Sequence, residues 1–139
     1  MINIIMNGCN GKMGQTITGI LKEDKDAKIV AGIDKFDGIK NDYPVFPSLD
    51  ACDVKADVII DFSNAKAVPT ILEFALSRKK PFICCTTALS DETVNNILKA
   101  SEQIAVFKSA NMSIGINLMI ELAKQATKIL YPDFDIETI

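Results

Sequence analysis

The chain has 139 residues, 48% of them hydrophobic and 24% charged, with a formal net charge of −3 and no histidine. This composition is typical of a soluble single domain; it argues against a nucleic-acid partner, because no basic stripe is present, and against a membrane span, because no apolar run approaches roughly 20 residues. Without histidine the chain lacks the commonest metal ligand, so no metal site is predicted, and without a signal peptide in residues 1–7 the expected location is cytoplasmic.

Apolar runs alternate with segments of helical periodicity along almost the whole chain. The apolar runs predict strands at residues 3–7, 28–34, 57–61, 81–85 and 104–108. Helical periodicity predicts helices at residues 12–23, about 67–77, 91–101 and 114–130. Because the strands are apolar throughout, they suit a parallel sheet covered on both faces. The predicted fold class is therefore α/β, a Rossmann-like, doubly wound, mostly parallel sheet with helices on both faces.

Individual residues mark the ends of the predicted helices. Ser90 and Ser113 are N-cap candidates, Pro69 fits only a first helical turn, and Pro132 ends the last helix. Between the second and third predicted strands, residues 36–47 predict an irregular connection, followed by room for one short helical turn at residues 48–53.

A glycine-rich turn joins the first predicted strand to the first predicted helix. Gly8, Gly11 and Gly14 are spaced Gly-x-x-Gly-x-x-Gly. Glycines there let the backbone approach a pyrophosphate, and the helix N-terminus behind them offers free N–H groups and a partial positive charge. About twenty residues past Gly14, Asp34 ends the second strand, where an acid usually binds a ribose hydroxyl. Together these features predict a dinucleotide site.

Asp34 is followed by Lys35, and this pair predicts the type of coenzyme. A carboxylate accepts hydrogen bonds from ribose hydroxyls and repels a 2′-phosphate, whereas an adjacent cation attracts that phosphate. The pair predicts that both NADH and NADPH are accepted. The alternative is a solvated charge pair at a strand end.

Other polar residues follow the carboxyl ends of the later strands, where ligands bind in an open parallel sheet. Thr86 and Thr87 suit the nicotinamide region, or are ordinary turn residues. Asn111 and Ser113 line the cleft, cap the last helix, or do both. The four cysteines, with no Cys-x-x-Cys pair, are interpreted as buried reduced thiols. For Cys9 the alternative is a reactive thiol, because a nearby helix N-terminus lowers the pKa of a thiol.

These motifs together resemble the dihydrodipicolinate reductase family, also called 4-hydroxy-tetrahydrodipicolinate reductases, of bacterial lysine and diaminopimelate synthesis. The resemblance runs through residues 8–14, 34–35, 61–63, 86–87, 109–117 and 135–137. It implies hydride transfer from NADH or NADPH to a cyclic unsaturated dicarboxylate. It also implies a homotetramer formed through a second domain.

The resemblance assigns cofactor-binding residues in three groups. The pyrophosphate would lie against Gly8, Cys9, Asn10, Gly11, Lys12 and Met13. The adenosine ribose and its 2′-phosphate would contact Asp34 and Lys35, with Phe62 and Ser63 nearby. The nicotinamide would be flanked by Cys85, Thr86, Thr87, Ser109, Ala110, Asn111 and Met112.

Two departures from the family pattern limit these expectations. Cys85 and Ala88 stand on either side of the threonine pair, where the family has glycine, and alanine adopts positive φ less readily. The family's substrate motifs, His-His-x-x-Lys and Ser-Gly-Thr, are not in this chain. No catalytic residue is therefore predicted here, and the chain is expected to bind cofactor without turning over substrate.

The end of the chain alternates polar and apolar residues over 133–139, as a half-buried strand does. It is either the entry to another domain or an edge strand of this one. We predict a dinucleotide-binding domain over residues 1–132, and a strand from residue 133 that leads into a substrate and oligomerisation domain. An apolar patch on the helix at 114–130 is expected to promote association.

Two other functions fit the same first domain. One is the cofactor domain of a different NAD(P)-dependent dehydrogenase, of the homoserine or aspartate dehydrogenase type. The other is a non-enzymatic dinucleotide sensor. Fold alone does not choose among them.

Overall fold

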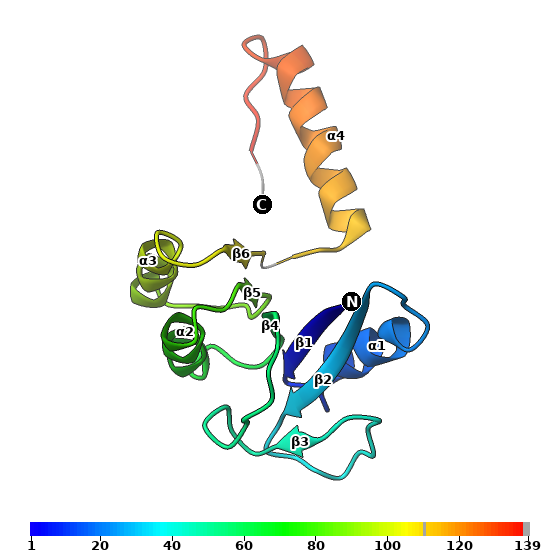
Figure 1. Ribbon diagram of the computed structural model, residues 1–139. Coiled ribbons are helices and arrows are strands. Elements are labelled where there is room, and N and C mark those ends of the chain that lie inside the picture. Colours follow the sequence, from blue (N-terminus) through cyan, green and yellow to red (C-terminus); the bar gives the residue numbers. More distant parts are fainter. Residues whose placement is uncertain (110, 138–139) are drawn as a thin grey trace.

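The computed structural model describes residues 1–109 and 111–137, and within them a six-stranded sheet is flanked by helices (Figure 1). In chain order the elements are β1 (Ile2–Asn7), α1 (Lys12–Leu21), β2 (Ala27–Ile33), β3 (Val45–Phe46), β4 (Val58–Asp61), α2 (Val68–Ser77), β5 (Phe82–Cys84), α3 (Asp91–Ala100), β6 (Val106–Lys108) and α4 (Ile114–Leu130). The predicted α/β class is confirmed, with most boundaries within two residues of those expected.

The sheet has the strand order β3-β2-β1-β4-β5-β6, and every pairing is parallel. The chain runs outward from β1 through β2 to β3 and then returns to place β4 on the other side of β1. This reversal is the topological switch point, where ligands bind outside the carboxyl ends of the strands. Asn7, the last residue of β1, pairs with Ile33 of β2 and Asp61 of β4.

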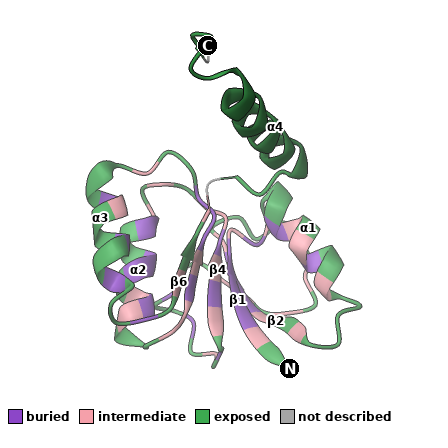
Figure 2. Cartoon of the chain, turned by 90° about the horizontal axis from the view of Figure 1, so that it is seen from above, coloured by how far each residue is buried: buried purple, intermediate pink, exposed green. Residues whose placement is uncertain are grey.

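Helices cover the sheet on both sides: α1 lies on one side, with α2 and α3 on the other (Figure 2). Ile5, Ile59 and Phe82 belong to the large apolar cluster that also contains buried residues of α2 and α3. Ile4 and Met6 point to the opposite face of β1 and are also buried. Burial on both faces explains why the strands are apolar throughout instead of alternating.

The structure adds one strand that the sequence analysis missed. β3 has two residues, Val45 and Phe46, and pairs with Gly32 and Ile33 of β2. It lies between Pro44 and Pro47, within the segment predicted to be irregular. Proline is tolerated there because β3 is at the edge of the sheet. The short helical turn expected at 48–53 is a single turn, closed by the Cys52 N–H donating to the Leu49 carbonyl oxygen at 3.0 Å.

Helix α4 has the predicted bounds, and Ser113 caps it by accepting the N–H of Ile116 at 3.4 Å. None of its side chains is buried, and the helix stands away from the sheet and its flanking helices (Figures 1 and 2). The apolar residues Ile114, Leu118 and Ile129 are exposed. In the part of the chain that the structure describes, no helix is long and apolar enough to cross a membrane.

The strand expected at residues 133–139 is not present in residues 133–137, which form a turn, a bend and then coil. Residues 138 and 139 lie outside the described residues. An alternating segment becomes a strand only when another strand pairs with it. The six strands found in residues 1–109 and 111–137 pair only with one another, so the pattern has no partner there.

Helix α2 ends in a tight motif that requires a left-handed residue. The Lys80 N–H donates to the Ala75 carbonyl oxygen at 2.8 Å, and the Lys79 N–H donates to the Leu76 carbonyl oxygen at 3.1 Å. This is the Schellman arrangement, in which glycine usually occupies the left-handed position. Here that position is Lys79, with φ of 50°.

We expect Lys79→Gly to raise the free energy of unfolding by about 1 kcal/mol, because glycine adopts this φ without a Cβ penalty. Urea unfolding followed by circular dichroism measures the change. Lys80→Gly is the matched control, since Lys80 is outside the left-handed region and glycine there only adds unfolded-state entropy. A loss of stability in Lys79→Gly equal to that of the control would contradict the expectation.

Candidate functional site

The glycine turn lies at the switch point, and two of its glycines are needed for close backbone approach. Gly8 has φ of 76°, and a Cβ there would lie 2.6 Å from the Phe62 carbonyl oxygen. A Cβ on Gly14 would lie 2.6 Å from the Cys9 carbonyl oxygen. Gly8 therefore lets the turn pass against the loop after β4, and Gly14 lets α1 close onto the turn.

The N-terminus of α1 is free to receive an anion. Its N-cap is Gly11, no side chain caps it, and its first turn holds no acidic residue. The first N–H groups of a helix have no acceptor within the helix. By contrast, α3 is capped by Ser90 and carries Asp91 and Glu92 in its first turn. The exposed N–H groups and positive end of the α1 dipole fit a phosphate.

A cleft of about 650 Å³ opens beside this turn, outside the carboxyl ends of β1, β2, β3 and β4. Four of the predicted site residues, Gly8, Asp34, Lys35 and Ser63, line it. Several other residues line it that were not predicted from the sequence, including Ser48, Asp50, Asn64, Lys66 and Thr70. Their signal was their place in the segment after β3, between β4 and α2, or in the first turn of α2, where the parallel sheet exposes its carboxyl edge.

Asp34 is held against the glycine turn. One carboxylate oxygen accepts the N–H of Asn10 at 3.0 Å, and the other accepts the N–H of Phe36 at 3.1 Å. Each oxygen has a second lone pair left for a further donor. Lys35 is exposed on the same cleft, and no ion pair joins it to Asp34 among the residues that the structure describes.

Asp61 is a fully buried carboxylate that joins the ends of three strands. One oxygen accepts from Asn7 Nδ2 at 2.7 Å, from Ser63 Oγ at 2.6 Å and from the Ser63 N–H at 3.1 Å. The other accepts from Thr86 Oγ1 at 2.7 Å. Four donors thus compensate for the loss of water around the charge. The network fixes the carboxyl edge of β1, β4 and β5 as one unit.

This network changes the roles available to two predicted site residues. The hydroxyls of Ser63 and Thr86 both donate to Asp61, so what each has left to offer a ligand is its hydroxyl lone pairs and its backbone. Thr86 and Cys85 are also buried, whereas Thr87 is exposed. Ala88 adopts φ of 56°, so the loop keeps the glycine-like conformation despite its alanine.

Cys9 is buried, and its side chain points away from the anion site. The side chain is 0% exposed, and its Sγ lies 2.5 Å from where a Cβ on Gly32 would be. Burial, with a smaller contribution from the charge of Asp34, raises the pKa of the Cys9 thiol to about 11. The reactive-thiol alternative was therefore wrong, because loss of water outweighs the helix N-terminus. All four cysteines, Cys9 included, are buried free thiols, as the main interpretation predicted.

The remaining predicted residues of the turn have separate places. Lys12 and Met13 are exposed in the first turn of α1. The Asn10 side chain donates to the Phe36 carbonyl oxygen and accepts from Asn41 Nδ2 at 2.7 Å, so it is engaged with residues 36–41. Its N–H also donates to Asp34. Asn10 therefore supports the turn instead of presenting its amide to a ligand.

The segment after β6 connects to α4. Ser109 Oγ donates to the Asn111 carbonyl oxygen at 3.1 Å, and Asn111 Oδ1 accepts the Ser113 N–H at 2.7 Å. Asn111 and Ser113 thus form the turn that starts α4, as the capping interpretation predicted. Met112 is exposed, and Ala110 lies outside the described residues. Within residues 1–109 and 111–137, no group of three or more Cys, Asp or Glu side chains is placed to hold a metal ion.

The order of the strands, the glycine turn and the cleft at the carboxyl edge of the sheet together define a doubly wound α/β domain of the Rossmann class. A family model described as Dihydrodipicolinate reductase, N-terminus, matches residues 2–112. The 4-hydroxy-tetrahydrodipicolinate reductase of Clostridium tetani is 45% identical over 139 residues, 100% of this chain and 54% of that protein. The protein of the same name from Rickettsia rickettsii is 39% identical, over 100% of this chain and 55% of its own length.

Solved structures share the fold. Dipicolinate-bound dihydrodipicolinate reductase from Paenisporosarcina sp. TG-14 has a TM-score of 0.78 at 24% identity, over 91% of this chain and 54% of that one. The WlbA dehydrogenase from Bordetella pertussis, in complex with NADH and UDP-GlcNAcA, has a TM-score of 0.71 at 15% identity, over 90% and 42%. The chain belongs to the dihydrodipicolinate reductase family. It spans about half the length of the curated relatives it matches.

We expect Asp61→Ala to lower the free energy of unfolding by about 3 kcal/mol, because it leaves the buried donors of Asn7 and Thr86 without an acceptor. Asp61→Asn keeps an acceptor for Asn7 and can donate to Thr86 Oγ1, so its loss should be about 1 kcal/mol. Urea unfolding of the two variants and the wild type measures the difference. Equal losses in both variants would contradict this account of the network.

Alkylation by iodoacetamide at pH 8 should leave Cys9 unmodified in the folded chain. With the pKa raised to about 11, only about one Cys9 thiol in a thousand is ionised at that pH, and burial restricts access to it. Peptide mass spectrometry, with the urea-unfolded chain as control, identifies the modified cysteines. The thiolate fraction should rise about tenfold per pH unit up to about pH 10. Rapid labelling of folded Cys9 at pH 8 would contradict this pKa.

Proposed function

We propose that this chain is the NAD(P)H-binding half of a 4-hydroxy-tetrahydrodipicolinate reductase. The observation that carries the proposal is the uncapped N-terminus of α1 behind Gly8 and Gly14, with Asp34 held against the same turn. Membership of the family supports the same conclusion. The same geometry would also suit the sensor or the other dehydrogenases, so membership of the family is what favours the reductase over them.

The glycine turn fits the pyrophosphate of a dinucleotide. The space that a Cβ on Gly8 or Gly14 would take is filled by the chain's own backbone, so both glycines are required by the fold of the turn that presents the start of α1. Backbone N–H groups at the start of α1 would donate to the oxygens of the pyrophosphate. The residues that would contact it are Gly8, Cys9, Asn10, Gly11, Lys12 and Met13. The N–H groups of Gly8, Asn10 and Gly11 already donate within the chain, so these three residues would line the phosphate without supplying the N–H donors.

Asp34 and Lys35 would bind the adenosine end of the coenzyme. The lone pairs that Asp34 has left would accept ribose hydroxyls, and Lys35 would attract a 2′-phosphate in the cleft. This supports use of both NADH and NADPH. Ser63 lines the same cleft, and Phe62 follows β4 directly at the switch point.

The nicotinamide end would lie toward the carboxyl ends of β5 and β6, across the switch point from the adenosine cleft. Thr87 is exposed there, while Cys85 and Thr86 would contribute backbone. Residues 109–112 would lie on the other side. When bound, the coenzyme supplies the hydride that reduces a cyclic unsaturated dicarboxylate in lysine and diaminopimelate synthesis.

The reductase activity would require a chain as long as those of the curated relatives, and this chain covers about half of that length. We propose a cytoplasmic homotetramer in which residues 1–132 form the dinucleotide domain and residue 133 leads into the domain that holds the substrate. The family's name and the dipicolinate bound in the Paenisporosarcina structure support a dicarboxylate substrate.

Titration of the 139-residue chain with NADH and NADPH tests the proposal directly. Asp34→Ala should raise the ratio of NADPH affinity to NADH affinity about tenfold, because it removes the acceptor of the 2′-hydroxyl and the charge that repels the 2′-phosphate. Nucleotide fluorescence measures both dissociation constants. Asp37→Ala, a nearby exposed acid outside the cleft, is the control. An unchanged ratio in Asp34→Ala would exclude Asp34 as the ribose ligand.

A further inference from the structure

Residues 36–43, here called the strap, connect β2 toward β3 and run beside α1 and the glycine turn. We propose that Asn41, at the centre of the strap, is a positioning residue for the adenosine diphosphate half of the coenzyme. It acts through Asn10, which holds both the turn and Asp34. The inference rests on the proposed function and extends it to a residue that the sequence patterns did not single out.

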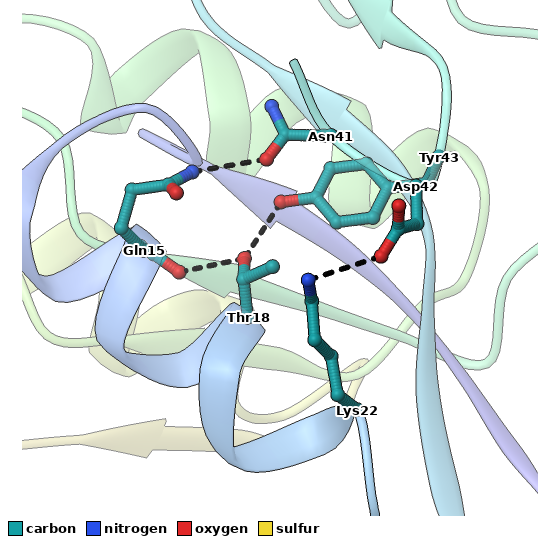
Figure 3. A network of polar contacts seen from close by, with 7 residues as sticks. Gln15, Thr18, Lys22, Asn41, Asp42 and Tyr43 are labelled. Atoms are coloured by element: carbon teal, nitrogen blue, oxygen red, sulfur yellow. Dashed lines mark hydrogen bonds and ion pairs between the residues drawn. The ribbon is translucent and has the colours of Figure 1, made fainter. Parts of the chain in front are cut away.

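The side chain of Asn41 makes hydrogen bonds in both directions near the start of α1. Its Nδ2 donates to Asn10 Oδ1 at 2.7 Å and to the Ile39 carbonyl oxygen at 3.3 Å. Its Oδ1 accepts from Gln15 Nε2 at 2.9 Å, a contact drawn in Figure 3. Gln15 Nε2 also donates to the Cys9 carbonyl oxygen at 3.0 Å. Asn41 thereby joins the strap to two residues that support the turn.

Asn10 connects Asn41 to Asp34, the proposed ribose ligand. Its Nδ2 donates to the Phe36 carbonyl oxygen, and its N–H donates to Asp34 at 3.0 Å. The Phe36 N–H donates to the other oxygen of Asp34 at 3.1 Å. A continuous path of hydrogen bonds therefore leads from Asn41 through Asn10 to Asp34. The same path fixes the turn whose N–H groups would face the pyrophosphate.

The chemistry of the two contacts explains why position 41 holds an asparagine. The position must donate to Asn10 Oδ1 and accept from Gln15 Nε2 at the same time, and a side-chain amide does both. An aspartate accepts only, so it keeps the Gln15 contact and loses the contact with Asn10. An alanine loses both. These differences allow the two contacts to be separated by mutation.

The strap has a second attachment to α1, farther from the turn. Tyr43 Oη lies 2.7 Å from Thr18 Oγ1, and Lys22 Nζ lies 3.1 Å from an oxygen of Asp42 (Figure 3). Thr18 Oγ1 donates to the Gly14 carbonyl oxygen, so the hydroxyl of Tyr43 donates to Thr18. The Lys22–Asp42 pair is exposed and contributes little. The second attachment packs the strap on the helix without touching Asn10 or Asp34.

Pre-ordering explains why the turn needs Asn41. The start of α1 has no side-chain cap, so the geometry of its free N–H groups depends on neighbouring segments. Binding a coenzyme to an unsupported turn would cost the conformational entropy of ordering it. Support from the strap removes that cost before binding.

The test compares Asn41→Ala with Tyr43→Phe in the 139-residue chain, with NADH as the probe. Each variant weakens one attachment of the strap, so each should lower the melting temperature, Asn41→Ala by more because it loses three hydrogen bonds and Tyr43→Phe one. Asn41→Ala should raise the NADH dissociation constant about tenfold, while Tyr43→Phe should leave it within about twofold of wild type. Equal dissociation constants in wild type and Asn41→Ala, or equal weakening in both variants, would overturn the inference.

A double-mutant cycle distinguishes positioning through Asn10 from a separate effect. The double variant Asn10→Ala, Asn41→Ala should bind NADH about as weakly as Asn10→Ala alone, and Asn41→Asp should resemble Asn41→Ala. Additive losses would overturn the route through Asn10. Failure of the wild-type chain to bind NADH would instead contradict the proposed function itself. If the wild type binds NADH and Asn41→Ala binds it equally tightly, only the role of Asn41 is contradicted.

Discussion

The geometry at the carboxyl edge of the sheet depends on one buried charge, the carboxylate of Asp61. Taking an ionised group out of water is costly unless it is fully hydrogen-bonded, and Asp61 has four donors from three segments. The compensation requires β1, β4 and β5 to end at the same level, since Asn7, Ser63 and Thr86 must all reach it. The switch point is therefore a rigid edge, and the glycine turn starts from it at a fixed position.

The glycine turn differs from this edge. Its backbone N–H groups provide hydrogen-bond donors, and other segments of the chain hold it in place. Without Cβ atoms, Gly8 can pack against the backbone of Phe62 and Gly14 against the backbone of Cys9. No side chain caps α1. Asp34 and the strap then hold the turn from the β2 side. A site with few side chains of its own is thus fixed by hydrogen bonds from a segment about 30 residues away in sequence, notably between Asn10 and Asn41.

Local pattern predicted most of the secondary structure and the core of the site. The apolar runs and the spacing of Gly8, Gly14 and Asp34 are local signals, so strands, helices and the turn followed from them. β3 was missed because its two residues lie between prolines, where only tertiary pairing with β2 makes a strand. The engagement of Thr86 by Asp61 and the bonds of Asn41 are long-range contacts without a local pattern. The tail at 133–137 shows the converse, a strand pattern without a partner strand.

Ala88 has a consequence for the motions of the loop after β5. An alanine at φ of 56° is held there by its surroundings, at a cost of order 1–3 kcal/mol that a glycine would not bear. That cost narrows the energy gap between the observed loop and its alternatives. Relaxing that strain would take residue 88 out of the left-handed region, while Thr86 stays held by its hydrogen bond to Asp61. The rigid edge set by Asp61 thus leads, two residues further on, into a backbone position held under strain.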